Sequence, residues 1–191
     1  MSDKYKIRDK DKPYFLTMTV VDWIDLFTRS NHKLLIVNSL KYCIENYGLT
    51  VFAWCLMPSH LHCICRADGE FSLSDILRNF KTFTSKSLVN QVYDEAESRR
   101  EWLLERFAKA CSHLKGNRNY KVWQDGNEAK EIYSTAFMYE KLEYTHNNPV
   151  KDLIVEKPED YLFSSARNYA GLDNLLDVFV INHKPLIQNW K

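Results

Sequence analysis

Two histidines and two cysteines lie within six positions of the chain, in the stretch MPSHLHCIC (57–65). Imidazole nitrogens and thiolate sulfurs are common zinc ligands, and paired cysteines also serve redox chemistry. A buried strand that happens to carry polar atoms is the third interpretation. The preceding run, VFAWCL, is almost entirely apolar, so the stretch is expected to lie in a sheet.

Strand geometry separates the two pairs. Side chains alternate between the two faces of a strand, so His60 and His62 project together while Cys63 and Cys65 point to the other face. A zinc cage that uses all four is therefore disfavoured. The cysteines are expected to pack in the core, and the two imidazoles can aim their nitrogens at one divalent cation. The alternative for the histidines is a pair of hydrogen-bonded, half-buried rings.

A third ligand and a nucleophile can come from a later helix that contains FMYEKLEYTHNNPVKD. Lys141, Tyr144 and Asn148 share one face of this helix. If that face meets the histidines, Asn148 can coordinate the cation and Tyr144 can hold its phenol beside it. A phenol has a pKa of about 10, so a cation or a base must activate it as a nucleophile. The alternative is a core tyrosine, and Tyr133 and Tyr139 are rival phenols.

The strands that must position these side chains are predicted from aromatic and β-branched runs. They cover residues 14–21, 49–57 and 60–67, and Pro58-Ser59 is the expected turn between the last two. The segment YKVWQ (120–124) is a candidate edge strand.

The helices are predicted from apolar residues at helical spacing. Their expected ranges are 31–46 with a stop at Gly48, 72 to about 92 with Ser72 as the cap, 97–113, and 131–148 with a stop at Pro149. Strands with local hairpin pairing, mixed with helices, predict an α+β fold with an antiparallel sheet, helices packed on one face and the catalytic helix near the C-terminus.

The composition favours a folded protein with a single main domain. The chain has 191 residues, of which 45% are hydrophobic, and it contains only five glycines and five prolines. Its apolar runs are shorter than the roughly 18 to 20 residues of a membrane helix, and its N-terminus lacks the apolar core of a signal peptide. The five cysteines lack the spacing of a disulfide framework, which is consistent with thiols that stay reduced inside a cell. We therefore expect a cytoplasmic protein without a membrane partner.

Charge is distributed unevenly along the chain, although the net charge is only +1. Residues 99–121 hold seven basic side chains against two acidic ones. The basic residues are Arg99, Arg100, Arg106, Lys109, Lys115, Arg118 and Lys121. A solvated helix face explains most runs of this kind, and a phosphate-binding surface is the alternative.

Together these motifs resemble those of the HUH single-tyrosine transposases (IS200-like), in their REP-associated branch. PSHLHCIC resembles the His-hydrophobic-His signature, and EYTHNNPVKD with PEDYLFSSARNYAG resembles the tyrosine helix and the segment after it. VWQDG resembles a motif that this family carries just before the tyrosine helix. The resemblance runs from Tyr14 to Gly171. It departs at Leu153, where relatives commonly carry glycine, and in a long insertion at about 90–119.

The resemblance implies a ferredoxin-like nuclease domain over residues 1–171, with a helical, basic insertion at about 90–119, and a C-terminal tail at 172–191. It implies Mg²⁺ or Mn²⁺ held by the metal ligands His60, His62 and Asn148. Tyr144 is then the catalytic nucleophile, as the relatives' tyrosine is.

The function implied is a metal-dependent endonuclease and strand transferase on single-stranded DNA. It would cleave through a 5′-phosphotyrosine, at hairpins such as REP elements, in the nucleoid. The basic residues of 99–121 and Lys141 would bind the DNA, with Tyr120 and Trp123 available for base stacking. A monomer and a homodimer that exchanges tyrosine helices both remain open.

Two alternatives belong to other classes. One is a non-catalytic, domesticated protein that binds DNA hairpins on the same fold. The other is a structural zinc protein, which thiolate ligation of a tightly held zinc would reveal.

Overall fold

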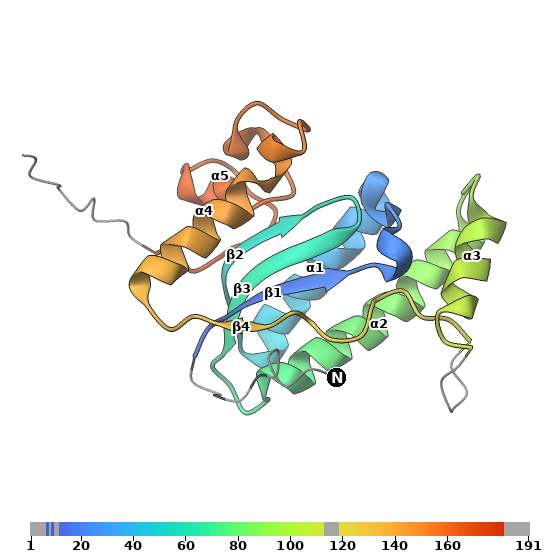
Figure 1. The fold of residues 1–191 in the computed structure, drawn as a ribbon, viewed down its shortest axis with the longest axis horizontal. Coiled ribbons are helices and arrows are strands. Elements are labelled where there is room, and N and C mark those ends of the chain that lie inside the picture. Colours follow the sequence, from blue (N-terminus) through green and yellow to red (C-terminus); the bar gives the residue numbers. More distant parts are fainter. Residues whose placement is uncertain (1–6, 8, 10–11, 113–118, 182–191) are drawn as a thin grey trace, which may run out of the picture.

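A four-stranded antiparallel sheet forms the centre of the molecule (Figure 1). The structure is a computed structural model that describes residues 7, 9, 12–112 and 119–181. The strand order is β2-β3-β1-β4, with β1 at Tyr14–Thr19, β2 at Leu49–Leu56, β3 at His60–Ala67 and β4 at Lys130–Glu131. The three long strands agree closely with the predicted ranges.

The hairpin between β2 and β3 fixes the position of the two histidines. The predicted turn is confirmed, because the backbone N–H of Met57 donates to the carbonyl of His60 at 2.8 Å. On the other side of β3, the register of β1 sets Thr17 opposite His62 and Thr19 opposite His60. Since β3 is hydrogen-bonded on both edges, its histidines stand on a central strand.

Five α-helices and three short 3-10 helices surround the sheet in the described residues. The bounds are α1 Ser30–Tyr47, α2 Leu73–Asp94, α3 Arg100–Lys109, α4 Thr135–Lys151, α5 Ala166–Tyr169, η2 Val21–Trp23, η3 Leu26–Thr28 and η4 Pro158–Asp160. The predicted stop of α1 is confirmed: Gly48 has φ +69°, and a Cβ there would lie 2.8 Å from the backbone nitrogen of Gly69. The predicted cap of α2 is confirmed too, since the hydroxyl of Ser72 accepts from the N–H of Asp75 at 3.2 Å.

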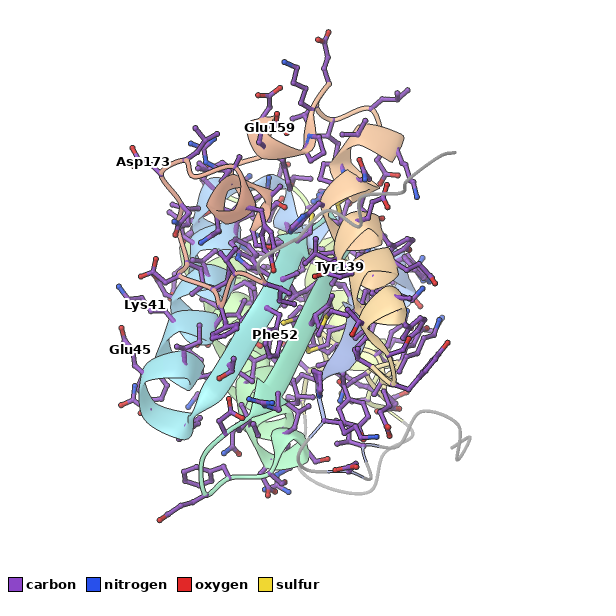
Figure 2. All side chains as sticks on the ribbon, turned by 90° about the vertical axis from the view of Figure 1, so that its left-hand side faces the viewer. Lys41, Glu45, Phe52, Tyr139, Glu159 and Asp173 are labelled. Atoms are coloured by element: carbon purple, nitrogen blue, oxygen red, sulfur yellow. The ribbon has the colours of Figure 1, made fainter. Side chains whose placement is uncertain are left out.

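The two faces of the sheet carry different layers. The larger apolar cluster joins α1 and α2 to strand residues such as Leu16, Cys63 and Cys65, so both cysteines are core residues as predicted. The smaller cluster, on the other face, joins Phe15 and Ile64 to side chains of α4. Figure 2 shows the strands between α1, marked by Lys41 and Glu45, and α4, which carries Tyr139. The α+β class with an antiparallel sheet is confirmed: α1 and α2 pack on one face, and α4 lies across the opposite face.

Three predicted boundaries are wrong. The fourth strand is Lys130–Glu131 rather than 120–124, where Trp123 makes only an isolated bridge to Val20. The insertion helix α3 is shorter than 97–113, since Glu97 lies before its first turn and accepts from the N–H of Arg99 at 2.9 Å. Helix α4 starts four residues later than predicted and continues through Pro149 to Lys151. A proline costs the helix only one backbone hydrogen bond in this last turn.

The chain turns sharply after α4, at Leu153. This residue has φ +57°, in the left-handed region that favours glycine, and its side chain is 90% exposed. Leucine therefore adopts the turn for which the resembling family commonly carries glycine.

Leu153→Gly is expected to raise the free energy of unfolding by about 1 kcal/mol, because it removes the Cβ that strains this conformation. The matched control is Leu153→Ala, which removes the exposed side chain and keeps the Cβ, and it should leave stability nearly unchanged. Urea unfolding of the three proteins measures the difference. A glycine variant no more stable than the alanine variant would show that the turn is unstrained.

The described part of the tail, 172–181, packs on the outside of β2. The N–H of Phe179 donates to the carbonyl of Val51 at 2.8 Å, and Leu176 is 2% exposed. No helix among the described residues is long and apolar enough to cross a membrane.

Candidate active site

The two histidines of β3 aim their Nε2 atoms at one point. The Nε2 atoms of His60 and His62 lie 3.1 Å apart. Each Nδ1 lies beside a hydroxyl: that of His60 is 3.1 Å from Oγ of Ser59, and that of His62 is 3.1 Å from Oγ1 of Thr17. In the tautomer in which both Nδ1 atoms donate to these hydroxyls, both Nε2 lone pairs are available to a cation. Hydrogen-bond partners on the other ring nitrogen orient metal-binding histidines in this way.

Burial keeps both rings neutral at physiological pH. The pKa of His62 is lowered to about 3, first by burial and then by the neighbouring His60. Burial also lowers the pKa of His60, and Asp152 partly opposes that shift. A neutral imidazole is the form that can ligate a metal.

The face of α4 that carries Tyr144 meets this pair. The ring centroids of Tyr144 and His62 are 5.3 Å apart with an interplanar angle of 72°. The same phenol ring packs edge-on against Phe15, at 5.8 Å, and Tyr144 remains 37% exposed. The histidines and the predicted nucleophile therefore come together within one chain, and solvent can reach the phenol.

Asn148 lies one helical turn beyond Tyr144 on the same face of α4. Its side chain is 9% exposed, and its amide nitrogen donates to the carbonyl of Tyr144 at 2.7 Å. The amide oxygen is the atom that could coordinate a hard cation. One further turn along, Asp152 is close enough to His60 to raise its pKa. Tyr144 and Asp152 are thus each close to a histidine of β3, and Asn148 lies between them at intervals of four residues.

The histidine pair fits a six-coordinate divalent cation. Two ligands at right angles, each about 2.1 Å from such an ion, lie about 3 Å apart, which matches the separation of the Nε2 atoms. In the described part of the chain, no three His, Cys, Asp or Glu side chains gather at one point. The described residues therefore contain no zinc cage, and a cation here would need the amide oxygen of Asn148 or water in addition to the imidazoles.

Two lysines flank the phenol. The ammonium groups of Lys141 and Lys151 lie 5.5 and 5.1 Å from the centroid of the Tyr144 ring. Lys141 also pairs with Glu140 at 2.7 Å. These cations place positive charge where a phosphate that approaches Tyr144 would lie.

The rival phenols occupy other surroundings. Tyr133 precedes α4, is 71% exposed and stacks on Phe137 at 4.7 Å. Tyr139 is near Tyr169, whose pKa it helps to raise. Of the three candidates, Tyr144 is the one whose ring contacts a β3 histidine.

A buried hydrogen-bond cluster anchors α4 to β2. Nε2 of His146 lies 2.8 Å from Oγ of Ser165, and this hydroxyl accepts from the backbone N–H of Trp54 at 2.9 Å. Burial lowers the pKa of His146 to about 4, so its ring is neutral. Because His146 stands two residues after Tyr144, the anchor fixes α4 close to the nucleophile.

The predicted DNA-binding residues do not gather on one surface. Arg99 and Arg106 pair with acidic side chains of the loop after β1, at 2.6 Å to Asp25 and 3.6 Å to Asp22. Arg100 instead donates to the carbonyls of Val92 in α2 and of Glu95 just after it, at 2.9 and 2.6 Å. Lys109 is exposed, Lys121 lies in a groove beside α2, and Lys141 lies at the phenol. Lys115 and Arg118 fall outside the described residues.

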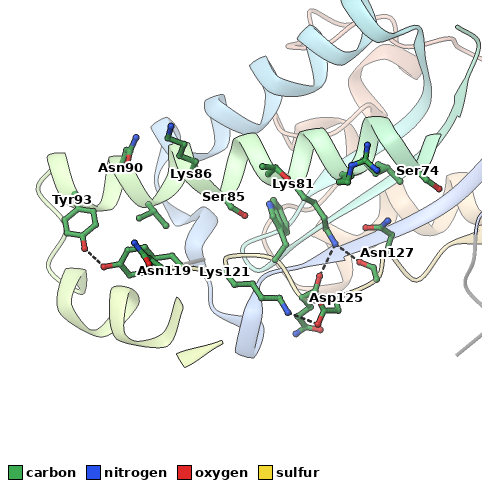
Figure 3. Close-up of a pocket in the computed structure, with 18 residues that line it drawn as sticks. Ser74, Lys81, Ser85, Lys86, Asn90, Tyr93, Asn119, Lys121, Asp125 and Asn127 are labelled. Carbon is green, nitrogen blue, oxygen red and sulfur yellow. Dashed lines mark hydrogen bonds and ion pairs between the residues drawn. The ribbon is translucent and has the colours of Figure 1, made fainter. Parts of the chain in front are cut away.

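The groove between α2 and residues 119–127 has a volume of about 740 Å³ (Figure 3). Its charged lining residues are Arg78, Lys81, Lys86, Lys121 and Asp125. The ammonium of Lys81 donates to the carbonyls of Gln124 and Gly126 at 3.0 and 2.5 Å, and burial lowers its pKa to about 8. Lys121 pairs with Asp125 at 2.7 Å. Lys81 and Lys121 therefore hold the groove wall in place, while Lys86 is exposed on its rim.

The expected stacking role of Trp123 is wrong. This residue is 3% exposed, its ring packs against Phe27 and Phe80, and its indole N–H donates to the hydroxyl of Thr84 at 2.9 Å. Trp123 is a core residue because its segment runs along the edge of β1. Tyr120 lines the groove, where its hydroxyl is hydrogen-bonded to that of Tyr93.

Sequence reasoning missed Asp152 and Lys151. The expected stop at Pro149 placed both residues beyond the helix, although the helix continues to Lys151. The spacing of four residues from Tyr144 through Asn148 to Asp152 was the available signal.

Comparisons with known proteins bear on part of the chain and on its fold. The family model described as "Transposase IS200 like" matches residues 24–115, which contain both histidines of β3 and end before α4. A solved structure of a REP-associated tyrosine transposase bound to a REP hairpin is similar to this chain, with a TM-score of 0.59, 22% sequence identity and coverage of 96% of each chain. No curated protein matches. Residues 24–115 are therefore similar to the IS200-like transposase family, and the fold of the whole chain is similar to that of a REP-associated tyrosine transposase.

Proposed function

We propose that the protein is a metal-dependent transposase that cleaves and rejoins single-stranded DNA at hairpins of the REP type. The observation that carries this proposal is the contact between Tyr144 and His62, with the Nε2 atoms of His60 and His62 converging 3.1 Å apart. The similarity to the IS200-like transposase family supports the reaction class. The similar fold of a protein bound to a REP hairpin supports the substrate.

His60, His62 and Asn148 would hold Mg²⁺ or Mn²⁺, which when bound would polarise the scissile phosphate and stabilise its developing charge. The phenol oxygen of Tyr144, which is 37% exposed, attacks phosphorus and gives up its proton to water. The bond between phosphorus and the 3′ oxygen breaks, and that oxygen takes a proton and leaves as a free 3′-hydroxyl. The phosphate remains linked to Tyr144 and to the 5′ end of the other fragment.

The covalent intermediate conserves the energy of the phosphodiester. A second 3′-hydroxyl can attack the phosphotyrosine, displace the phenol and join two strands without ATP. Lys141 and Lys151, whose ammonium groups lie close to the Tyr144 ring, would bind the phosphate oxygens during both steps. The protein is therefore proposed to be a strand transferase and not only a nuclease.

The alternative is hairpin binding without cleavage, by a domesticated protein in which the basic surfaces alone act. The contact of Tyr144 with His62 favours catalysis, because a binding protein needs no accessible phenol beside a pair of converging imidazoles. A homodimer and a cytoplasmic, nucleoid-associated location remain predictions.

The test is an adduct assay with single-stranded DNA that carries a REP-type hairpin and unpaired flanks. With Mn²⁺, a 3′-end label should migrate with the protein on a denaturing gel, while a 5′-end label should leave on a shorter free strand. EDTA should abolish both products. Binding without any adduct across such hairpins, in Mn²⁺ and in Mg²⁺, would favour the binding protein, and a 5′-end label on the protein would contradict the proposed linkage.

A further inference from the structure

An exposed tryptophan borders the histidine pair. Trp23 belongs to η2, in the loop that follows β1, and is 59% exposed, although tryptophan is usually well buried. Its ring centroid lies 5.5 Å from that of His60, with an interplanar angle of 70°. A largely bare indole surface therefore stands next to one of the two proposed metal ligands.

The backbone holds Trp23 in an unusual conformation. Asp22 and Trp23 have φ values of +53° and +56°, a region that residues other than glycine seldom adopt. The N–H of Trp23 donates to the carbonyl of Val20 at 3.1 Å, and the flanking Val21 and Ile24 are 5% and 4% exposed. Two buried neighbours thus fix the loop while the indole stays outside. Strained residues of this kind persist mainly at functional sites.

Helix α3 continues this surface with cations and a second indole. Its Arg106 pairs with Asp22, and its Arg99 pairs with Asp25, so the helix is tied to the loop on both sides of Trp23. Between the two arginines lies Trp102, 41% exposed, whose ring centroid is 6.0 Å from the Arg99 guanidinium and 5.8 Å from that of Arg106. Aromatic faces interleaved with cations are the usual surface for an unpaired nucleic-acid strand.

We propose that Trp23 stacks an unpaired nucleobase adjacent to the scissile phosphate, and that Arg99, Trp102 and Arg106 bind the continuation of that strand. The bases inside a stem are already stacked on both faces, whereas an unpaired base has a free face for an indole, so we take the single-stranded flank and not the hairpin stem as the ligand. This inference rests on the proposed function, because the histidine pair places the scissile phosphate near Trp23.

The first measurement uses 2-aminopurine, whose fluorescence is quenched when it stacks. It is placed in turn at each flanking position around the cleavage site mapped with the wild-type protein. In the Tyr144→Phe background, which leaves the strand intact, one position should be quenched on binding. Adding Trp23→Ala should remove that quenching, and Trp23→Phe should retain part of it. The control Phe83→Ala removes an aromatic side chain that is 61% exposed on α2, on the far face of the sheet, and should change nothing.

The second measurement is the affinity for the same DNA. Trp23→Ala should bind the flanked hairpin roughly 5- to 150-fold more weakly, the range for losing one stacked base, while its affinity for the blunt hairpin stem stays the same. If wild-type protein forms no adduct, the proposed function fails and the inference falls with it. If the wild type forms the adduct but Trp23→Ala shows undiminished quenching and affinity, only the inference fails, and Trp23 merely covers His60.

Discussion

Tyr144→Phe is expected to abolish the covalent adduct and to lower strand cleavage by at least about a thousandfold. The substitution removes only the phenol oxygen, which is the atom that attacks phosphorus, and loss of a nucleophile commonly costs this much or more. The ring contacts with His62 and Phe15 remain possible for phenylalanine, so the fold and the DNA affinity should survive. Quantified adduct bands and single-turnover cleavage rates measure the loss, and gel-shift titration confirms that binding persists.

The rival tyrosines supply the matched controls. Tyr139→Phe and Tyr133→Phe also delete a single phenol oxygen, from the same helix and from the segment just before it, and each should keep cleavage within a few-fold of the wild type. If Tyr144→Phe still formed the adduct, or if Tyr139→Phe did not, Tyr144 would not be the nucleophile.

His60→Ala should weaken Mn²⁺ binding and adduct formation together, each by at least about a hundredfold. Loss of a residue that hydrogen-bonds a metal ligand lowers metal affinity or activity by about 10- to 100-fold. Loss of the ligand itself should lower them by at least the upper end of that range. His60 is only partly buried, which makes the alanine variant tolerable for folding. The six-line spectrum of free Mn²⁺ in electron paramagnetic resonance measures binding without reference to activity. Unchanged Mn²⁺ affinity in a folded His60→Ala protein would refute the proposed metal site.

A neighbouring asparagine provides a control that separates metal coordination by Asn148 from its hydrogen bond within the helix. Asn147 and Asn148 both donate to the carbonyl four residues earlier, at 3.0 and 2.7 Å. Only Asn148 shares the face of Tyr144 and Asp152. Asn148→Ala should therefore lower Mn²⁺ affinity, and Asn147→Ala should not. Equal effects of the two substitutions would assign Asn148 to helix stability alone.

The site could be predicted from the sequence to the extent that it depends on local periodicity. The alternation of side chains on a strand separated His60 and His62 from Cys63 and Cys65, and the structure confirms that both cysteines lie in the core. Helical spacing likewise placed Tyr144 on one face of its helix. These patterns follow from backbone geometry, which the sequence determines within a few residues.

The features of the site that the sequence did not predict depend on contacts between distant segments. Periodicity could not show that α4 crosses the histidine face of the sheet, because that contact joins segments about eighty residues apart. Trp123 carried no signal of its burial, since its partners Phe27 and Thr84 lie in other elements. The exposure of Trp23 depends in the same way on its buried neighbours Val21 and Ile24.

Mapping the protein–DNA linkage tests the central claim most directly, namely that the histidines of β3 and the tyrosine of α4 form one catalytic site. Adduct formed with Mn²⁺ on hairpin-bearing single-stranded DNA is digested with nuclease and protease, and the modified peptide is sequenced by mass spectrometry. We predict a nucleotide linked through phosphate to Tyr144, absent when His60 is replaced by alanine. Linkage to Tyr133, to Tyr139 or to any other residue would contradict the account.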